Sequence, residues 1–194
     1  MTSRLFLLVL LSFCLRCSWG VAAPPSITLL GHFGQWEAYR LNDSNQRVCF
    51  MVLNHESKHS PLHRRGQAHL MITQRPDENA FDIVSYSSGY FFLPSHDVQM
   101  QVDTKPFNLF ADKDTAWSRT SRVDHELTQA ICQGHTMTIH GISAQKGNPT
   151  VTDYLDISGS YLAYKTISQA CGIEGVPAIP PNPHARHKPH PTPL

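Results

Sequence analysis

The chain lacks a long apolar run beyond its first residues, and it lacks an excess of basic charge. No stretch after residue 23 is apolar for about 18 residues, so we predict no transmembrane span in the mature chain. Residues 1–23 contain Arg4 and Arg16 and no acid, which leaves 14 Lys and Arg against 15 Asp and Glu, a formal charge of −1. Proteins that bind phosphates without sequence preference carry a clear basic excess. Nucleic acid is therefore not predicted as a partner.

The chain also lacks the sequence signatures of a catalytic site. Its candidate chemical groups, Asp153, Asp156, His135, His140 and Ser143, include the residue types of a hydrolytic triad. No nucleophile elbow, paired-acid motif or fixed metal-ligand spacing surrounds them. His135 and His140 are five residues apart at a predicted strand start, so we expect their side chains to point to opposite faces. We predict no catalytic residue, no enzyme activity and no cofactor.

The first 23 residues are typical of an export signal. A charged start precedes the apolar segment Leu5 to Leu15, and Val21-Ala22-Ala23 offers small residues for cleavage. The mature chain is expected to begin near Pro24, with cleavage after Gly20 as the alternative. A membrane anchor is the competing interpretation, but Arg16 interrupts an apolar run that is too short to span a bilayer. We predict a location in the periplasm or cell envelope, or secretion.

Composition divides the rest of the chain into one domain and a tail. Residues 24–171 are numerous enough for one domain with a sizeable core. Residues 172–194 hold seven of the 14 prolines and few large apolar groups. Such a segment cannot bury enough surface to offset its ordering entropy, so we predict a disordered Pro/His-rich C-terminal tail.

Short strand-like patterns recur through the domain and predict a mainly β fold. Runs rich in aromatic and β-branched residues are separated by clusters of Asn, Asp, Ser, Gly and Pro. The predicted strands are residues 35–41, 47–53, 68–73, 81–87, 98–102, 107–110, 137–142 and 151–157. Because no long helix intervenes, the pattern predicts an antiparallel β-sandwich or barrel-like domain.

Two short helices interrupt the strands and are expected on the surface of the sheet. In the first, Ser121 to Asp124 resembles a capping pair, and Gly134 stands where a left-handed helix end is favoured. The second runs from about Ser160 to Cys171. The apolar stripe of the first is Val123, Leu127, Ala130 and Ile131, and that of the second is Ala163, Ile167, Ala170 and Cys171.

The large aromatic residues are assigned to the core, where they contribute most buried area. This assignment covers Trp36, Trp117 and the run Tyr90-Phe91-Phe92. For that run, an exposed contact patch is the alternative.

Three cysteines follow the predicted signal: Cys49, Cys132 and Cys171. An exported protein meets oxidising conditions, so a disulfide is expected. Both faces of the strand at residues 47–53 are apolar, which predicts that it is covered on both sides. Because the apolar stripe of the last helix ends at Cys171, a Cys49–Cys171 bond would fasten that helix over the strand and leave Cys132 free. Three buried reduced cysteines are the alternative.

A series of short motifs resembles the invasion-associated locus B family, and it covers nearly all of the domain from about Gly31 to Cys171. No single motif is specific, but they occur in the family's order and approximate spacing. They are Phe33-Gly-Gln-Trp36, Arg47-Val-Cys-Phe50, Leu70-Met-Ile-Thr-Gln-Arg-Pro76, Ser88-Gly-Tyr-Phe-Phe92, Phe107-Asn-Leu-Phe110, Asp114-Thr-Ala-Trp117, Gly141-Ile-Ser-Ala144, Thr152-Asp-Tyr154, Ser158-Gly159, and Ala163-Tyr164 through Ala170-Cys171.

The resemblance implies an extracytoplasmic binding protein, associated in some pathogens with entry into host cells and without an established catalytic activity. It implies a protein or envelope component as the partner, or a host-cell surface. The sequence departs from the family at Asp103-Thr104, where Asp-Gly is expected, and at Cys132, where the helix residue is commonly apolar. The Pro/His-rich tail is additional to the family's pattern.

The loop from Asn54 to Gly66 is the predicted binding region. It joins two predicted strands, and Leu62 is its one obvious core residue. Long loops on a rigid β scaffold are where binding residues concentrate. The predicted partner-binding residues are His59, His63, Arg64 and Arg65. An ordinary solvated basic loop is the alternative.

The 12 histidines include two clusters with spacings that suit zinc or copper. One is His55, His59 and His63 in the loop, and the other, His184, His187 and His190 in the tail, is the candidate metal site. A metal-handling protein is therefore one alternative function, and a small extracytoplasmic enzyme is another.

Overall fold

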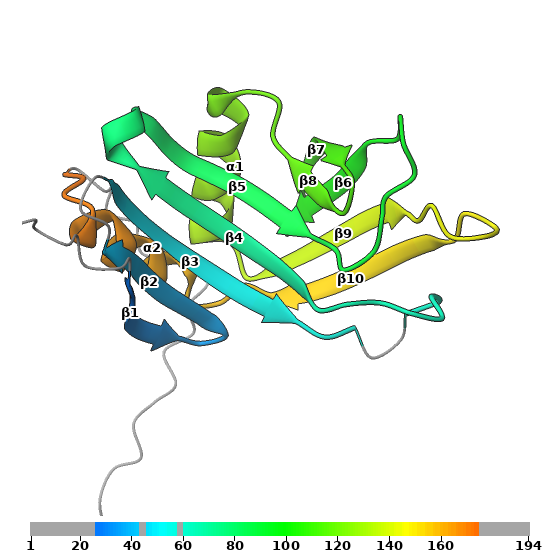
Figure 1. Ribbon diagram of the computed structural model, residues 1–194, viewed down its shortest axis with the longest axis horizontal. Coiled ribbons are helices and arrows are strands. Elements are labelled where there is room, and N and C mark those ends of the chain that lie inside the picture. Colours follow the sequence, from blue (N-terminus) through cyan, green and yellow to red (C-terminus); the bar gives the residue numbers. More distant parts are fainter. Residues whose placement is uncertain (1–25, 43–45, 58–59, 175–194) are drawn as a thin grey trace, which may run out of the picture.

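The described chain is built mainly from β-strands (Figure 1). The computed structural model describes residues 26–42, 46–57 and 60–174. Within them the strands are β1 (Ser26–Phe33), β2 (Trp36–Asn42), β3 (Arg47–His55), β4 (Ala68–Arg75), β5 (Ala80–Ser87), β6 (Val98–Val102), β7 (Lys105–Asp112), β8 (Thr115–Trp117), β9 (Thr136–Ile142) and β10 (Thr150–Asp156). The helices are α1 (Ser121–Gln133) and α2 (Ser160–Ala170), with a 3-10 turn at Pro76–Glu78. The predicted signal and the candidate tail site at His184, His187 and His190 lie outside the described residues.

All strands of the described chain belong to one antiparallel sheet. Their order is β1-β2-β3-β4-β5-β8-β7-β6-β9-β10, so β1 and β10 are the end strands. His55 at the end of β3 contacts Asp153 of β10, so the sheet folds back on itself. It does not close, because β1 and β10 do not pair with each other. The predicted mainly antiparallel β fold is confirmed, and the open sheet fits a sandwich-like domain rather than a closed barrel.

The core lies on the inward face of this folded sheet. Along β6, for example, Val98, Met100 and Val102 are buried, whereas Gln99 and Gln101 are exposed, as the period-two geometry of a strand requires. α1 packs mainly against β5, and α2 packs mainly against β2 (Figure 1). Both predicted helical stripes are confirmed: Leu127, Ile131, Ala163, Ile167 and Cys171 are buried, and Val123 and Ala130 of the first stripe and Ala170 of the second are partly buried.

The ends of α1 differ from the prediction. Thr120 caps the helix, because its side-chain oxygen accepts a hydrogen bond from the Val123 N–H at 3.3 Å. Asp124 does not take part in this cap, because its Oδ1 accepts the Val84 N–H of β5 at 3.0 Å. Gly134 has φ −89°, so no left-handed end forms there. A Cβ atom at this position would lie 2.7 Å from Val102 Cγ1, so close packing is the reason for glycine.

The prediction that β3 is covered on both faces holds only in part. Cys49, Met51 and Leu53 are buried on the inward face. On the other face Val52 is buried, but Val48 and Phe50 are only half-buried. Phe50 stacks on the neighbouring Tyr39, with ring centroids 5.2 Å apart. Neighbouring aromatic side chains on the outward face therefore shield one another in place of a covering layer.

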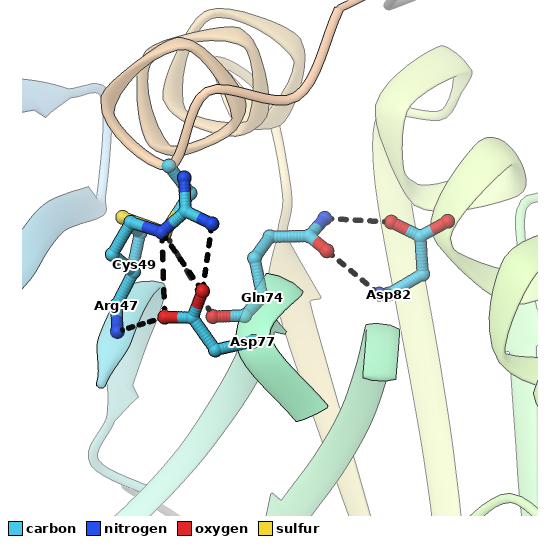
Figure 2. Close-up of a disulfide and its surroundings, with 6 residues drawn as sticks. Arg47, Cys49, Gln74, Asp77 and Asp82 are labelled. Carbon is cyan, nitrogen blue, oxygen red and sulfur yellow. Dashed lines mark hydrogen bonds and ion pairs between the residues drawn. A yellow bond between two sulfur atoms is a disulfide. The ribbon is translucent and has the colours of Figure 1, made fainter. Parts of the chain in front are cut away.

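A disulfide joins Cys49 of β3 to Cys171, directly after α2, and this is the pair that the sequence predicted. The two Cα atoms are 5.9 Å apart and 122 residues separate the cysteines along the chain. Figure 2 shows the bond beside the Arg47–Asp77 ion pair, in which an Nη2–Oδ1 distance of 2.6 Å links β3 to the turn after β4. The disulfide therefore fastens the end of the last helix to an inner strand of the sheet.

Aromatic residues are divided between the core and the surface. Trp36, Tyr90 and Phe92 are buried, as predicted. Trp117 is only half-buried, and Phe91 is 65% exposed, because alternate residues of the 90–92 segment point in opposite directions. Within the described residues, neither α1 nor α2 has the length and apolar composition needed to cross a membrane.

Candidate functional site

The loop between β3 and β4 contains the predicted binding residues, and the structure separates them. His63 and Arg64 are exposed, and Leu62 is partly buried against the core. The Arg65 side chain, by contrast, is only 7% exposed. Arg65 is therefore not available to a partner, which corrects the expectation from sequence. His59 lies outside the described residues.

Arg65 is buried because it neutralises Asp153 on the inward face of β10. Its Nη1 and Nη2 donate to Asp153 Oδ1 and Oδ2, each at 2.7 Å, in a two-pronged ion pair. Its Nε donates to the Ser88 carbonyl at 2.8 Å, and its guanidinium lies 5.3 Å from the centre of the Tyr90 ring. Bidentate pairs of this kind combine a strong interaction with a fixed geometry. The arginine thus anchors the loop to two other parts of the sheet.

Two further side chains complete what we call the Asp153 cluster (Arg65, Asp153, Tyr86, His55 and Tyr90). The Tyr86 hydroxyl donates to Asp153 Oδ2 and accepts from Arg65 Nη2 at 3.1 Å. His55 Nε2 lies 3.3 Å from Asp153 Oδ1. The carboxylate is only 1% exposed, so each of its oxygens has found protein partners in place of water.

The electrostatics of the Asp153 cluster favour the charged carboxylate. Burial alone opposes ionisation, but hydrogen bonds from His55, Arg65 and Tyr86 outweigh burial and hold the pKa of Asp153 below its usual range. Burial and the Asp153 charge raise the pKa of Tyr86, so its phenol stays protonated and can donate. The cluster is an ion pair with satisfied partners rather than an acid poised to give up or take a proton near neutral pH.

An open groove of about 590 Å³ lies beside this anchor and is called the Arg64 groove. It is lined by Arg64, Gly66, Gln67, His69, Ser87, Gly89, Tyr90, Phe91, Asp114, Ala144 and Gln145. Its base is held by close backbone contact, because the Gly66 N–H donates to the Gly89 carbonyl at 2.8 Å. Gly89 has φ +73°, and a Cβ atom there would lie 2.2 Å from the Gly66 carbonyl oxygen, so glycine is required.

The backbone of Arg64 is fixed by a second residue of the groove lining. Gln145 Nε2 donates to the Arg64 carbonyl at 2.9 Å, which links this loop to the turn between β9 and β10. With Arg65 held by Asp153 one residue later, Arg64 projects from a rigid stretch of chain. Among residues 26–42, 46–57 and 60–174, the Arg64 guanidinium makes no ion pair. Its charge is therefore available at the groove.

A second buried carboxylate, Asp82 of β5, holds both helices to the sheet. Its Oδ1 accepts from Gln74 Nε2 and the Tyr164 hydroxyl, each at 2.7 Å, and its Oδ2 lies 2.7 Å from His125 Nδ1. Figure 2 shows Gln74 reaching from β4 to this carboxylate. Burial and the Asp82 charge raise the pKa of the nearby Cys132 to about 12, so this thiol is not activated as a nucleophile.

Four of the five residues that suggested a hydrolytic triad are engaged with different partners, and the fifth, His135, is exposed. Asp153 belongs to the ion pair with Arg65, and His140 Nδ1 lies 2.9 Å from Thr152 Oγ1. The Ser143 hydroxyl accepts the Gln145 N–H at 3.1 Å, and the Asp156 carboxylate accepts the Ser158 N–H at 2.9 Å. No group of three His, Cys, Asp or Glu side chains suited to a metal occurs in the part of the chain that the structure describes.

Sequence reasoning missed the roles of Asp153, Tyr86 and Tyr90. A signal was present for Asp153, because it alternates with Val151 and Leu155, both buried on the inward face of β10. A carboxylate at an inward position requires a cationic partner or a proton. Nothing local to the sequence indicated that Arg65, 88 residues earlier, would supply the cation.

The fold is similar to the crystal structure of invasion associated protein B from Bartonella henselae. The match covers 73% of this chain and 96% of that chain, with a TM-score of 0.54 and 16% sequence identity. No protein-family model matches the sequence, and no curated protein is a significant match. At this identity the likeness establishes a shared fold, in agreement with the family resemblance drawn from the ordered motifs.

Proposed function

We propose that this chain is an exported binding protein of the cell envelope, of the invasion-associated protein B type. The fold likeness to the Bartonella protein supports this assignment. The Cys49–Cys171 disulfide supports export, because such bonds persist in oxidising compartments and are rare in the cytosol. The predicted signal at residues 1–23 supplies the route, and the periplasm, the envelope or the outside of the cell is the destination.

The protein acts by binding rather than by chemistry, and the Arg64 groove is its recognition site. The observation that carries this proposal is the contrast between neighbours: Arg65 is buried in an ion pair, whereas Arg64 stands exposed at the groove. A rigid loop with a free charge loses little conformational entropy on binding. Phe91, 65% exposed and also in the lining, adds an apolar contact.

The lining indicates the chemistry of the partner. Arg64 favours a carboxylate or phosphate, because its guanidinium can donate two parallel hydrogen bonds. Phe91 and Tyr90 favour an apolar or aromatic group beside that anion. The partner is a protein or envelope component that presents both groups, and its source is the bacterial envelope or a host-cell surface.

Affinity capture followed by direct binding tests this function. The immobilised protein is exposed to envelope extract and to host-cell surface extract, and any captured component is purified and titrated by calorimetry. Arg64→Glu should weaken its affinity at least about tenfold, because attraction becomes repulsion. Lys165→Glu on α2 is the matched control, since it changes the net charge equally at an exposed site away from the groove lining. Equal affinities of the two variants would contradict the assignment.

A further inference from the structure

β10 is an open edge of the sheet, and its hydrogen-bonding pattern can be deduced from its pairing. β10 pairs only with β9 among the described strands, over seven residues without a bulge. The Ser143 N–H donates to the Pro149 carbonyl, and the Ile157 N–H donates to the His135 carbonyl. Because hydrogen-bonded and non-hydrogen-bonded pairs alternate in an antiparallel ladder, the odd-numbered residues of β10 direct their backbone groups toward β9.

The even-numbered residues, Thr150, Thr152, Tyr154 and Asp156, therefore direct their N–H and C=O groups away from the sheet. The hydrogen bonds of β9 are consistent with this pattern. The Ile142 and Thr136 carbonyls accept hydrogen bonds from the Leu93 and Asp103 N–H groups instead of from β10. Within residues 26–42, 46–57 and 60–174, no backbone group pairs with the outer edge of β10. This edge is a row of unused donors and acceptors.

A groove of about 570 Å³ lies along this edge and is called the β10 groove. Its lining includes Thr150, Thr152 and Tyr154, three of the residues with outward-directed backbone groups, and its other wall is formed by His55, Glu56, Ser57 and Pro61. The His55 contact with Asp153 and the Arg65–Asp153 pair fix the separation of the two walls. The free edge therefore borders a groove whose other wall is held by these contacts.

Natural sheets protect free edges with prolines, lysines, bulges or unpaired inward charges. β1, at the other end of the sheet, has a bulge between Leu29 and Gly31. β10 has no bulge, no lysine and no proline, and its inward charge at Asp153 is neutralised by Arg65. These protections within the strand itself are thus absent from β10, and the loop that faces it leaves a groove along the edge.

We propose that the β10 groove binds an extended peptide segment of a partner protein, which adds to the sheet as a strand beside β10. Strand addition gives affinity through the backbone and leaves specificity to side chains. Glu56 makes no ion pair within the described residues, Asp156 is exposed, and Tyr154 is 72% exposed. Two carboxylates and an exposed aromatic ring select a basic side chain, which can form an ion pair and stack on the ring.

The first test uses synthetic peptides and the purified full chain. The probe is the blocked hexapeptide acetyl-Thr-Val-Arg-Val-Arg-Thr-amide, titrated by calorimetry. We expect a dissociation constant below about 1 mM, which corresponds to about 4 kcal/mol. The same peptide N-methylated at alternate residues should bind at least about tenfold more weakly, because it cannot complete the ladder. A glutamate-for-arginine version should also bind more weakly. No binding of the basic peptide at about 1 mM, or equal binding of its N-methylated form, would overturn the proposal.

The second test uses variants of β10. Thr152→Pro removes an edge N–H without removing a bond to β9, a position that tolerates proline, and should weaken peptide binding about tenfold or more. Thr152→Val keeps the N–H and should bind within about twofold of the original protein. Circular dichroism establishes that both variants are folded. If the valine variant lost as much affinity as the proline variant, the backbone would not be the binding element.

Amide hydrogen exchange by NMR supplies a readout that binding through side chains alone would not give. Saturating peptide should slow exchange at the free amides of Thr150, Thr152 and Tyr154, while Val151 and Asp153, already bonded to β9, should change little. Uniform or absent protection would contradict strand addition. Arg64→Glu should leave the affinity for this peptide unchanged. The test of peptide binding at β10 is therefore independent of the test of partner binding at the Arg64 groove.

Discussion

Arg65 and Asp153 form a two-pronged ion pair across 88 residues of sequence, with both N–O distances at 2.7 Å. The pair joins the loop before β4 to the inward face of β10, and it is almost completely removed from solvent. It rigidifies the chain on which Arg64 is presented, and it fixes the wall of the β10 groove. The most direct predictions concern this pair.

Removing the arginine should be strongly destabilising. Arg65→Met should lower the free energy of unfolding by about 3–5 kcal/mol, because it leaves the Asp153 carboxylate buried without its cation. Arg64→Met, one residue earlier at an exposed site, should change it by less than about 0.5 kcal/mol. Urea denaturation measures both. Combining Arg65→Met with Asp153→Leu should restore part of the loss, and strictly additive losses would argue against a coupled pair.

Acid should weaken the fold through the same carboxylate. The pKa of Asp153 is held below its ordinary value of 3.8 in the folded protein, so its stabilising contribution is present above that value. The contribution is lost as the pH falls toward the lower folded-state value. Asp153→Asn should therefore be less stable than the original protein at about pH 6, and this difference should shrink between about pH 5 and pH 2. Denaturation curves across this range measure it, and a constant difference would contradict the assignment.

The disulfide should contribute a large part of the stability. A bond that closes a loop of this length is worth about 4–5 kcal/mol in the chain-entropy model, which is an upper figure. The Cys49→Ala and Cys171→Ala double variant should therefore melt well below the original protein, while Cys132→Ala should lack this loss of loop closure. Mass mapping of unreduced peptides should recover the Cys49–Cys171 link, and a link through Cys132 would contradict the structure.

Cys132 should be a poorly reactive thiol in the native protein. Its pKa is raised from 9.0 to about 12 by burial and by the Asp82 charge, so its thiolate fraction near neutral pH falls about a thousandfold. Iodoacetamide at about pH 8 should label it very slowly until denaturant is added. Asp82→Asn tests the electrostatic part: labelling should become faster while circular dichroism shows that the variant is still folded. Rapid labelling of the original native protein would contradict the raised pKa of this partly buried thiol.

The strand pattern could be predicted where alternation was clear. All eight predicted strands are present, because alternate burial leaves a period of two in the sequence. β1 and β8 were missed for different reasons. Five of the eight residues of β1 are exposed, so the strand carries little alternating signal, and β8 has only three residues. Helix positions were also predictable, but the cap is Thr120, one residue before the predicted Ser121. Asp124 accepts a hydrogen bond from Val84, a tertiary contact that no local pattern indicated.

The binding loop could be located from its length and composition, but the roles of its residues could not. Arg64 and Arg65 are adjacent and chemically identical, yet one lines the groove and the other is buried. Neighbouring residues in an irregular loop have no fixed alternation, so no local pattern distinguishes them. The free edge of β10 was equally hidden, because its exposure depends on the strand order of the whole sheet.

The sequence by itself determined the antiparallel β class and the positions of α1 and α2, because each follows from periodicity along a single element. The apolar stripes of two elements also indicated the Cys49–Cys171 pair, which the structure contains. Only the tertiary structure decided which arginine meets Asp153, which aromatic side chains reach solvent and which strand edge faces a groove. These features depend on the folding back of the sheet, which brings β10 against the end of β3. The separation of two residues along the chain does not indicate whether they meet in the fold. Once Asp153 is buried, however, its charge requires a cationic partner such as Arg65.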